Sequence, residues 1–186
     1  ANIAASTVIK KIGTATVNKK EIEEIYENRN KVINKKFYTS NSEILKKIQT
    51  IRSKNMKIVM TNGCFDIIHA GHIHLLENAK KLGDFMIVAI NSDKSVKLLK
   101  GKRRPVNKLS ARIEVLKSLS CVDLIVVFNE LTPLKTIKMI SPDVLVKGGD
   151  YKIRDIIGAD LIKANKGIVK IIKTKKGYST TKILQR

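Results

Sequence analysis

The 186-residue sequence predicts an α/β fold in which an open, Rossmann-like parallel sheet carries helices on both faces. From residue 57 onward, short apolar runs alternate with stretches of helical periodicity. Gly83 and Pro133 stand where two of the helical stretches should end and begin. In such sheets ligands bind beyond the carboxyl ends of the strands, so the loops after the strands should carry the function.

The chain before residue 57 predicts helices and a linker. Residues 1–12 have small and apolar side chains at helical spacing, and Asn18 with Glu21 forms a capping pair for a short polar helix. Residues 28–41 are basic and polar, which is typical of a linker. Ser42 is predicted to cap a further helix that packs on the following domain. Its expected apolar face is Ile44, Leu45, Ile48 and Ile51.

Five apolar runs predict the strands, at residues 58–60, 85–90, 124–128, 144–146 and 168–172. The helix after the first strand repeats apolar residues up to Leu82 and should stop at Gly83. Pro133 should open the helix that reaches Ile140, and the last helix is expected from about Ser179 to the end.

The turn over residues 61–72, TNGCFDIIHAGH, lies between the first strand and its helix and, with His74, holds every histidine of the chain. A glycine-containing turn before a helix suits a phosphate, because the helix start has unpaired N–H groups and a partial positive charge. His69 and His72 are three residues apart and face the same side, whereas His74 is rotated away. Imidazole N–H groups can bond phosphate oxygens and stabilise a leaving pyrophosphate. The pattern indicates phosphate chemistry.

Two other interpretations of these histidines stay open. They could be structural residues at a helix start, as we expect for His74, or two ligands of a zinc ion. Zinc normally takes three or four ligands, and only Cys64 and Asp66 stand nearby. Because no second Cys/His cluster completes a ligand set, we predict no protein-bound metal.

Further loops after predicted strands also suit anions. Residues 100–105, KGKRRP, place four cations beside a glycine, and they would repel one another without a bound anion. The paired glycines of residues 147–151, KGGDY, let a ligand approach the backbone, and residues 177–181, GYSTT, put hydroxyls at a helix start. Any one of these could be a solvated charge run, a plain turn or an ordinary cap. Together they describe one phosphate-binding crevice.

With these motifs the sequence resembles the nucleotidyltransferase superfamily, which has a His-x-Gly-His signature after a Gly-x-Phe-Asp turn. Here the two elements are residues 63–66, GCFD, and 69–72, HAGH. The resemblance implies that both histidines contact the nucleotide triphosphate at the transition state, with His72 at the developing charge. It also implies that Phe65 and Asp66 shape the turn and that Gly63 lets the nucleotide approach the backbone.

Residues 91–93, 104–107, 146–151 and 179–181 resemble the adenylyltransferase half of bifunctional heptose 7-phosphate kinase and heptose 1-phosphate adenylyltransferase enzymes. This resemblance implies ATP as substrate with Mg²⁺. It further implies transfer of AMP to D-glycero-β-D-manno-heptose 1-phosphate, giving pyrophosphate and ADP-heptose for lipopolysaccharide core synthesis. The attacking phosphate oxygen is already an anion, so positioning and charge stabilisation replace a general base.

The resemblance also implies a set of site residues. We expect His69, His72 and Lys100 to be catalytic. The expected nucleotide-binding residues are Asn62, Gly63, Cys64, Phe65, Asp66, Gly71, Asn91, Asp93, Lys147, Gly148, Asp150, Ser179, Thr180 and Thr181. The phosphates or the acceptor should be bound by Lys102, Arg103, Arg104 and Arg112.

Residues 1–17 resemble the end of a ribokinase-like sugar kinase, with a plain amphipathic helix as the alternative. We therefore expect a kinase tail at 1–30, a linker and helix at 31–54, and a nucleotidyltransferase domain at 55–186, with a kinase domain in a longer parent chain. No apolar run approaches the ~20 residues that span a bilayer, so no membrane partner and a cytoplasmic location are expected. The oligomeric state stays open, a homodimer included.

The net charge of +21 raises the alternative of a basic nucleic-acid-binding module. A coding bias toward A and T explains the charge better, because lysines are spread along the chain and only 4% of residues are aromatic. We therefore expect no nucleic-acid partner. Another alternative keeps the fold and changes the substrates, as in a cytidylyltransferase for glycerol 3-phosphate. A third is a folded chain that is scarcely active without its kinase half.

Overall fold

The computed structural model of the chain describes residues 20, 36–37 and 40–173. The predicted helices before residue 30, the last helix and the expected site residues Ser179, Thr180 and Thr181 lie outside the described residues. The chain divides into a unit of residues 1–36 and a unit of residues 37–186. The second unit carries the fold described below.

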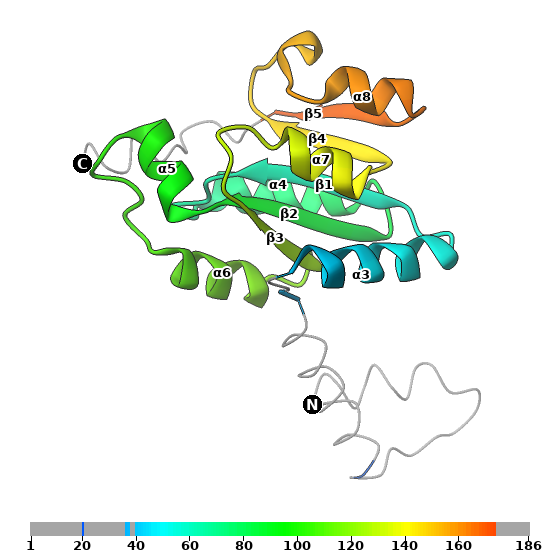
Figure 1. Cartoon of the computed structure of the whole chain (residues 1–186), viewed down its shortest axis with the longest axis horizontal. Helices are drawn as coiled ribbons and strands as arrows, with labels where there is room; N and C mark the ends of the chain where they lie inside the picture. Colours follow the sequence, from blue (N-terminus) through cyan, green and yellow to red (C-terminus); the bar gives the residue numbers. More distant parts are fainter. Residues whose placement is uncertain (1–19, 21–35, 38–39, 174–186) are drawn as a thin grey trace. The chain divides into compact units, whose positions relative to one another are not determined.

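The strands form one parallel sheet, as predicted (Figure 1). They are β1 (Ile58–Gly63), β2 (Phe85–Asn91), β3 (Leu124–Phe128), β4 (Val144–Gly148) and β5 (Ile168–Ile172). Their spatial order is β3-β2-β1-β4-β5, so the chain winds outward from β1 on one side and then crosses to β4 on the other. The crossing makes a topological switch point between β1 and β4, where open α/β sheets bind ligands.

The interior strand β2 shows how the sheet separates two apolar cores. Met86, Val88 and Ile90 point to one face, and the residues between them point to the other. All are buried. This period of two explains why the sequence of β2 reads as a continuous apolar run instead of an alternating one.

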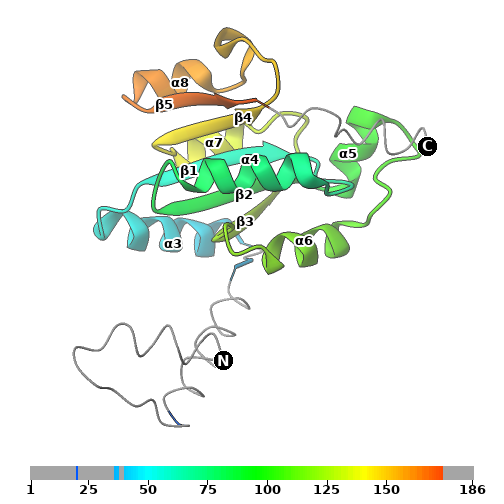
Figure 2. The ribbon, with the colours of Figure 1, turned by 180° about the vertical axis from the view of Figure 1, so that it is seen from behind.

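Helices cover both faces of the sheet (Figures 1 and 2). The helices α3 (Asn41–Ser53), α7 (Leu134–Ile140) and α8 (Ala159–Ala164) contribute to the core on one face. On the other face lie α4 (Ala70–Lys80) and α6 (Leu109–Ser118). The helix α5 (Asp93–Lys100) follows β2, and a 3₁₀ turn, η1 (Ile153–Asp155), precedes α8. None of the helices in the described ranges has the length and apolar character needed to cross a bilayer.

The start of α3 differs from the prediction, because Ser40 and not Ser42 is its N-cap. The Ser40 hydroxyl accepts the N–H of Glu43 at 3.3 Å and donates to the Glu43 carboxylate at 2.9 Å. This reciprocal arrangement needs an acidic residue three positions after the cap, and Leu45 occupies that position for Ser42.

The apolar face predicted for α3 is right at three positions and wrong at Leu45. Ile44, Ile48 and Ile51 are buried against the sheet, whereas Leu45 is 41% exposed. Spacings of four and three residues keep the isoleucines on one side of the helix, and Leu45 is rotated away from them.

Other element boundaries also differ, and β2 and β4 continue to Asn91 and Gly148, beyond the predicted ends at residues 90 and 146. Strand β1 continues to Gly63, beyond the predicted end at residue 60, so Asn62 belongs to the strand end. Helix α4 ends at Lys80, before Gly83. A Cβ atom at Gly83 would lie 2.7 Å from Val59 Cγ2 and 2.8 Å from the Lys57 carbonyl oxygen, so close packing requires this glycine. Pro133 directly precedes α7, as predicted.

Candidate functional site

A cleft of about 650 Å³ opens at the carboxyl ends of the strands, where the fold predicts a ligand site. Its walls come from the ends of β1 to β4 and from the segments that follow them. The structure brings most of the predicted site residues that it describes into this cleft. The predicted residues that line it are Asn62, Gly63, Cys64, Phe65, Asp66, His69, Gly71, His72, Asn91, Lys100, Arg104, Lys147 and Gly148.

The histidine pair lies at the start of α4. His69 is the N-cap residue, with an extended backbone, and His72 lies in the first turn. Their rings stack with centroids 3.9 Å apart, and the buried Phe65 ring lies 5.2 Å from His72. The spacing of three residues therefore produces the shared orientation that the sequence predicted.

Burial favours the neutral form of both imidazoles. Burial, with the neighbouring His69 as a smaller cause, lowers the pKa of His72 to about 4. Burial also lowers the pKa of His69. Nδ1 of His72 is buried and has no hydrogen-bond partner among the described residues. A neutral imidazole has one N–H donor and one lone pair, so each ring can donate one directional hydrogen bond to a phosphate oxygen.

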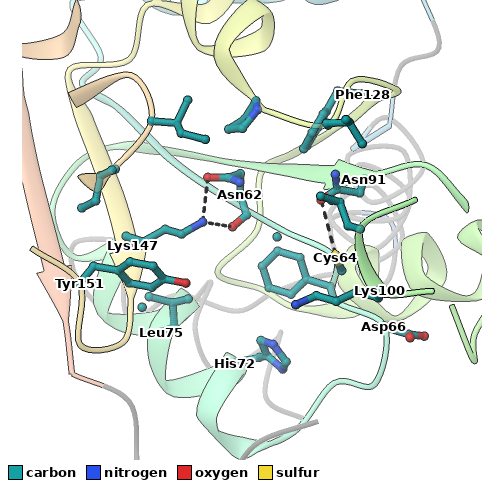
Figure 3. A pocket seen from close by; sticks show the side chains of 18 of the residues that line it. Asn62, Cys64, Asp66, His72, Leu75, Asn91, Lys100, Phe128, Lys147 and Tyr151 are labelled. Atoms are coloured by element: carbon teal, nitrogen blue, oxygen red, sulfur yellow. Dashed lines mark hydrogen bonds between the residues drawn. The ribbon is translucent and has the colours of Figure 1, made fainter. Parts of the chain in front are cut away.

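Lys147 and Lys100 point into the cleft from different elements (Figure 3). Lys147, on β4, donates to the backbone and side-chain oxygens of Asn62 at 3.4 and 3.3 Å, and its Nζ lies 5.8 Å from the centroid of the Tyr151 ring. Burial lowers the pKa of Lys147, and the charge of Lys100 acts in the same direction. The positive charges of Lys147 and Lys100 repel each other, and Lys147 is held only by long hydrogen bonds. An anion bound between them would stabilise both charges.

Asp66 holds the loop beside the cleft. Its Oδ1 accepts the backbone N–H groups of Val106 at 2.8 Å and Asn107 at 2.9 Å, and its Oδ2 accepts Nε of Arg104. Burial alone would raise the pKa of Asp66, but these hydrogen bonds and the Arg104 charge outweigh it, so the pKa is lowered. The carboxylate is therefore occupied within the protein, and it ties the turn after β1 to the loop of residues 104–107.

Several predicted residues are not brought into the cleft. Arg112 and Asp93 pair with each other at 2.7 Å (Nη2 to Oδ1), and neither lines the cleft. The exposed Lys102, Arg103 and Asp150 do not line it either. The sequence could not separate these residues from Lys100 and Arg104, because a run of charges in a loop does not tell which side chains turn inward.

The cleft also has lining residues that the sequence analysis did not select. They are Leu75, Leu99, Phe128, Leu131, Pro133, Tyr151, Asp155, Ile156 and Ile157. Phe128 ends β3, and Tyr151 follows β4, so the rule that ligands bind beyond strand ends could have found both. No local pattern marks Ile156 and Ile157, which only the tertiary fold brings to the cleft.

Comparison with known proteins identifies the family. A model of the cytidylyltransferase-like family matches residues 60–186. The chain is 47% identical to Bifunctional protein HldE of Hydrogenovibrio crunogenus over 188 residues, which cover 100% of this chain and 38% of that protein. It is 48% identical to the Haemophilus ducreyi protein of the same name, covering 100% of this chain and 39% of that one.

A solved structure shares the fold. The crystal structure of the lipopolysaccharide core biosynthesis protein from Thermoplasma volcanium aligns with a TM-score of 0.52 and 34% identity, covering 67% of this chain and 99% of that one. Three observations point to the same family. They are the match to the family model, the parallel sheet and the histidine pair at the start of α4. This chain belongs to the cytidylyltransferase-like family of nucleotidyltransferases.

Proposed function

We propose that this chain transfers AMP from ATP to D-glycero-β-D-manno-heptose 1-phosphate, forming ADP-heptose and releasing pyrophosphate. The observation that carries the proposal is the stacked His69–His72 pair, which shares one cleft with Lys100 and Lys147. The relatives named Bifunctional protein HldE and the solved lipopolysaccharide core biosynthesis protein support a role in sugar nucleotide synthesis.

The reaction needs one new bond and one broken bond. A phosphate oxygen of the sugar phosphate attacks the α-phosphorus of ATP, and the bond to the bridging oxygen breaks, so that pyrophosphate leaves with the electron pair. No proton has to be removed from the nucleophile. His69 and His72 donate hydrogen bonds to the phosphate oxygens as charge moves toward the leaving group, and Lys100 and Lys147 supply the positive charge.

We infer that Mg²⁺ arrives with ATP as part of the substrate. Within the described residues, no group of three or more His, Cys, Asp or Glu side chains could hold a metal ion. Mg²⁺ commonly takes most of its ligands from substrate phosphates and water, so it needs few ligands from the protein.

Pyrophosphate release tests the proposal. The chain is incubated with Mg²⁺, combining ATP or CTP with heptose 1-phosphate or glycerol 3-phosphate. Release only with ATP and heptose 1-phosphate is the expected result. A folded sample that releases no pyrophosphate in any combination refutes the proposal as stated for this chain.

A second candidate is cytidylyl transfer to another small phosphate such as glycerol 3-phosphate. The description of the matching family as cytidylyltransferase-like favours it. Release with CTP and glycerol 3-phosphate in the same assay would select it over the first. A nucleic-acid-binding module would instead bind arbitrary DNA in a salt-dependent way and release no pyrophosphate.

We further propose that the parent protein is a longer bifunctional enzyme in which a kinase domain adjoins this one. The chain spans only 38–39% of the length of two HldE relatives, which supports this organisation. Use of ATP and of a small sugar phosphate favours a cytoplasmic location. A homodimer is a further proposal, which sedimentation of the purified chain would test.

A further inference from the structure

Arg112 holds several segments of the site without lining the cleft. It lies on α6, and its residue surface is 1% exposed. Its Nη1 donates to the carbonyl oxygens of Cys64 at 2.6 Å and Asn91 at 2.9 Å. Its Nε donates to the carbonyl oxygen of Asn107 at 3.1 Å, and its Nη2 to Oδ1 of Asp93 at 2.7 Å. The guanidinium therefore joins the turn after β1, the end of β2, the start of α5 and the loop before α6.

This set of bonds is specific to arginine. A buried cation is tolerated only when its donors are matched, and the planar fork of a guanidinium can reach acceptors on several sides at once. The single carboxylate in the set, Asp93, also accepts the N–H of Leu109 at 3.2 Å, at the start of α6. A lysine at position 112 would keep the charge, but its single nitrogen could not reach all four acceptors.

We propose that Arg112 is a positioning residue that holds the cleft in its binding geometry before nucleotide arrives. It acts through the backbone of Cys64, five residues before His69, and through Asn107, whose N–H groups help to hold Asp66. Loss of these bonds should let the turn after β1 open while the two cores of the sheet remain folded. The catalytic part of this inference rests on the proposed function, and the positional part does not.

Cys64 provides a reporter of the turn. Its thiol faces the cleft, is partly buried and lies 3.7 Å from Oδ1 of Asn91. Since Arg112 binds the backbone of both residues, opening of the turn should expose this thiol. Cys121, between α6 and the amino end of β3, is partly buried as well and serves as an internal control.

The experiment measures iodoacetamide alkylation of both cysteines by mass spectrometry, on the whole chain, well below its melting temperature. Arg112→Lys should raise the alkylation rate of Cys64 about tenfold and leave that of Cys121 unchanged. It should also raise the KM for ATP more than it lowers kcat, because the binding geometry is lost before chemistry begins.

Arg52→Lys is the matched control. Arg52 donates to Oδ1 of Asp143 at 3.4 Å and to the Ser141 carbonyl oxygen, at the amino ends of the strands. This variant should lower the melting temperature without changing the alkylation of Cys64. If Arg112→Lys does not fold, Asp93→Asn provides the test. It removes the negative charge that pairs with Arg112 but keeps a side-chain oxygen, and it should raise the Cys64 rate about threefold.

Two results would overturn the inference. One is a Cys64 rate in the folded Arg112 or Asp93 variant that equals the rate in Arg52→Lys. The other is a parallel rise at Cys64 and Cys121 that follows the loss of melting temperature, which would indicate a merely structural role. Because alkylation requires no turnover, either result is readable even if the chain releases no pyrophosphate.

Discussion

Burial favours the neutral form of the two imidazoles of the site, and this determines what they can contribute to phosphate binding. With a pKa of about 4, His72 carries no charge at pH 7, so the positive charge comes from Lys100, Lys147 and the start of α4. The rings contribute direction, because each can donate one N–H in a fixed geometry. A bound triphosphate would raise the pKa of His72 again, since a nearby negative charge favours the protonated ring.

His72→Ala should lower kcat for pyrophosphate release about 10²- to 10³-fold, the usual effect of removing one transition-state donor. The melting temperature should fall only slightly, because the ring is only partly buried, lines the cleft and contacts a single core residue, Phe65. His74→Ala is the control: this side chain is exposed and contacts Asn78 on the same helix, so kcat should stay unchanged. A fall of less than tenfold in the His72 variant contradicts the role.

The lowered pKa of His72 also predicts how stability depends on pH. The unfolded chain binds a proton at His72 below about pH 6.5, whereas the folded chain does so only near pH 4. Stability from this group is therefore fully present above pH 6.5 and is lost as the pH falls toward 4. The upper limit is about 3 kcal/mol, reduced by partial exposure of the ring.

Melting curves at several pH values test this. Between pH 7 and 4.5 the wild-type melting temperature should fall more steeply than that of His72→Gln, which has no proton to bind at this position. Parallel curves for the two proteins would mean that His72 is not protonated differently in the folded and unfolded chains.

The amino edge of the sheet is closed by a repeated arrangement of aspartates. Asp84, Asp123 and Asp143 each stand directly before a strand. Each accepts a backbone N–H at or beside the start of a neighbouring strand, from Lys57 at 2.8 Å, Met86 at 2.7 Å and Ile58 at 2.7 Å respectively. The amino ends are thereby satisfied within the protein, while the cleft opens at the carboxyl ends of the strands.

Asp143→Ala should destabilise the chain by about 1–3 kcal/mol, because it leaves the buried N–H of Ile58 without its acceptor. Chemical denaturation measures the loss. Glu77→Ala, on the exposed side of α4, should change stability little and serves as the control. An equal stability of the two variants would show that the aspartate at the strand start contributes nothing. Activity should be retained, since Asp143 lies at the edge opposite the cleft.

The strands and the histidine turn could be predicted because their signals are local. Apolar runs predicted all five strands, but the predicted end of β1 at residue 60 was wrong, because the polar Thr61 and Asn62 are typical of the start of a turn. The role of Arg112 has no such signal, since three of its four acceptors are backbone carbonyls, and two of these, of Cys64 and Asn91, lie in distant segments. The sequence alone does not distinguish an arginine whose guanidinium is buried in the protein from one that binds phosphate.

The amino-terminal boundary of the nucleotidyltransferase domain depends on which segments contribute side chains to its hydrophobic cores. The prediction began the nucleotidyltransferase domain at residue 55, whereas the compact unit begins at residue 37. Helix α3 supplies Ile44, Ile48 and Ile51 to one core, at 2%, 5% and 3% exposure. Phe37 adds a parallel bridge to Ile125 of β3. We therefore propose that the functional domain starts at residue 37.

Two shortened chains test this boundary. A chain of residues 37–186 should keep the melting temperature of the cleft domain and its pyrophosphate release. A chain of residues 55–186 lacks α3, and burial of one isoleucine contributes roughly 1.5–3 kcal/mol, so the loss of three should remove a large part of the stability of a domain this size. It should also aggregate in gel filtration, because the face of the sheet under α3 would be exposed. If both chains melt alike and remain monodisperse, α3 is not part of the folding unit.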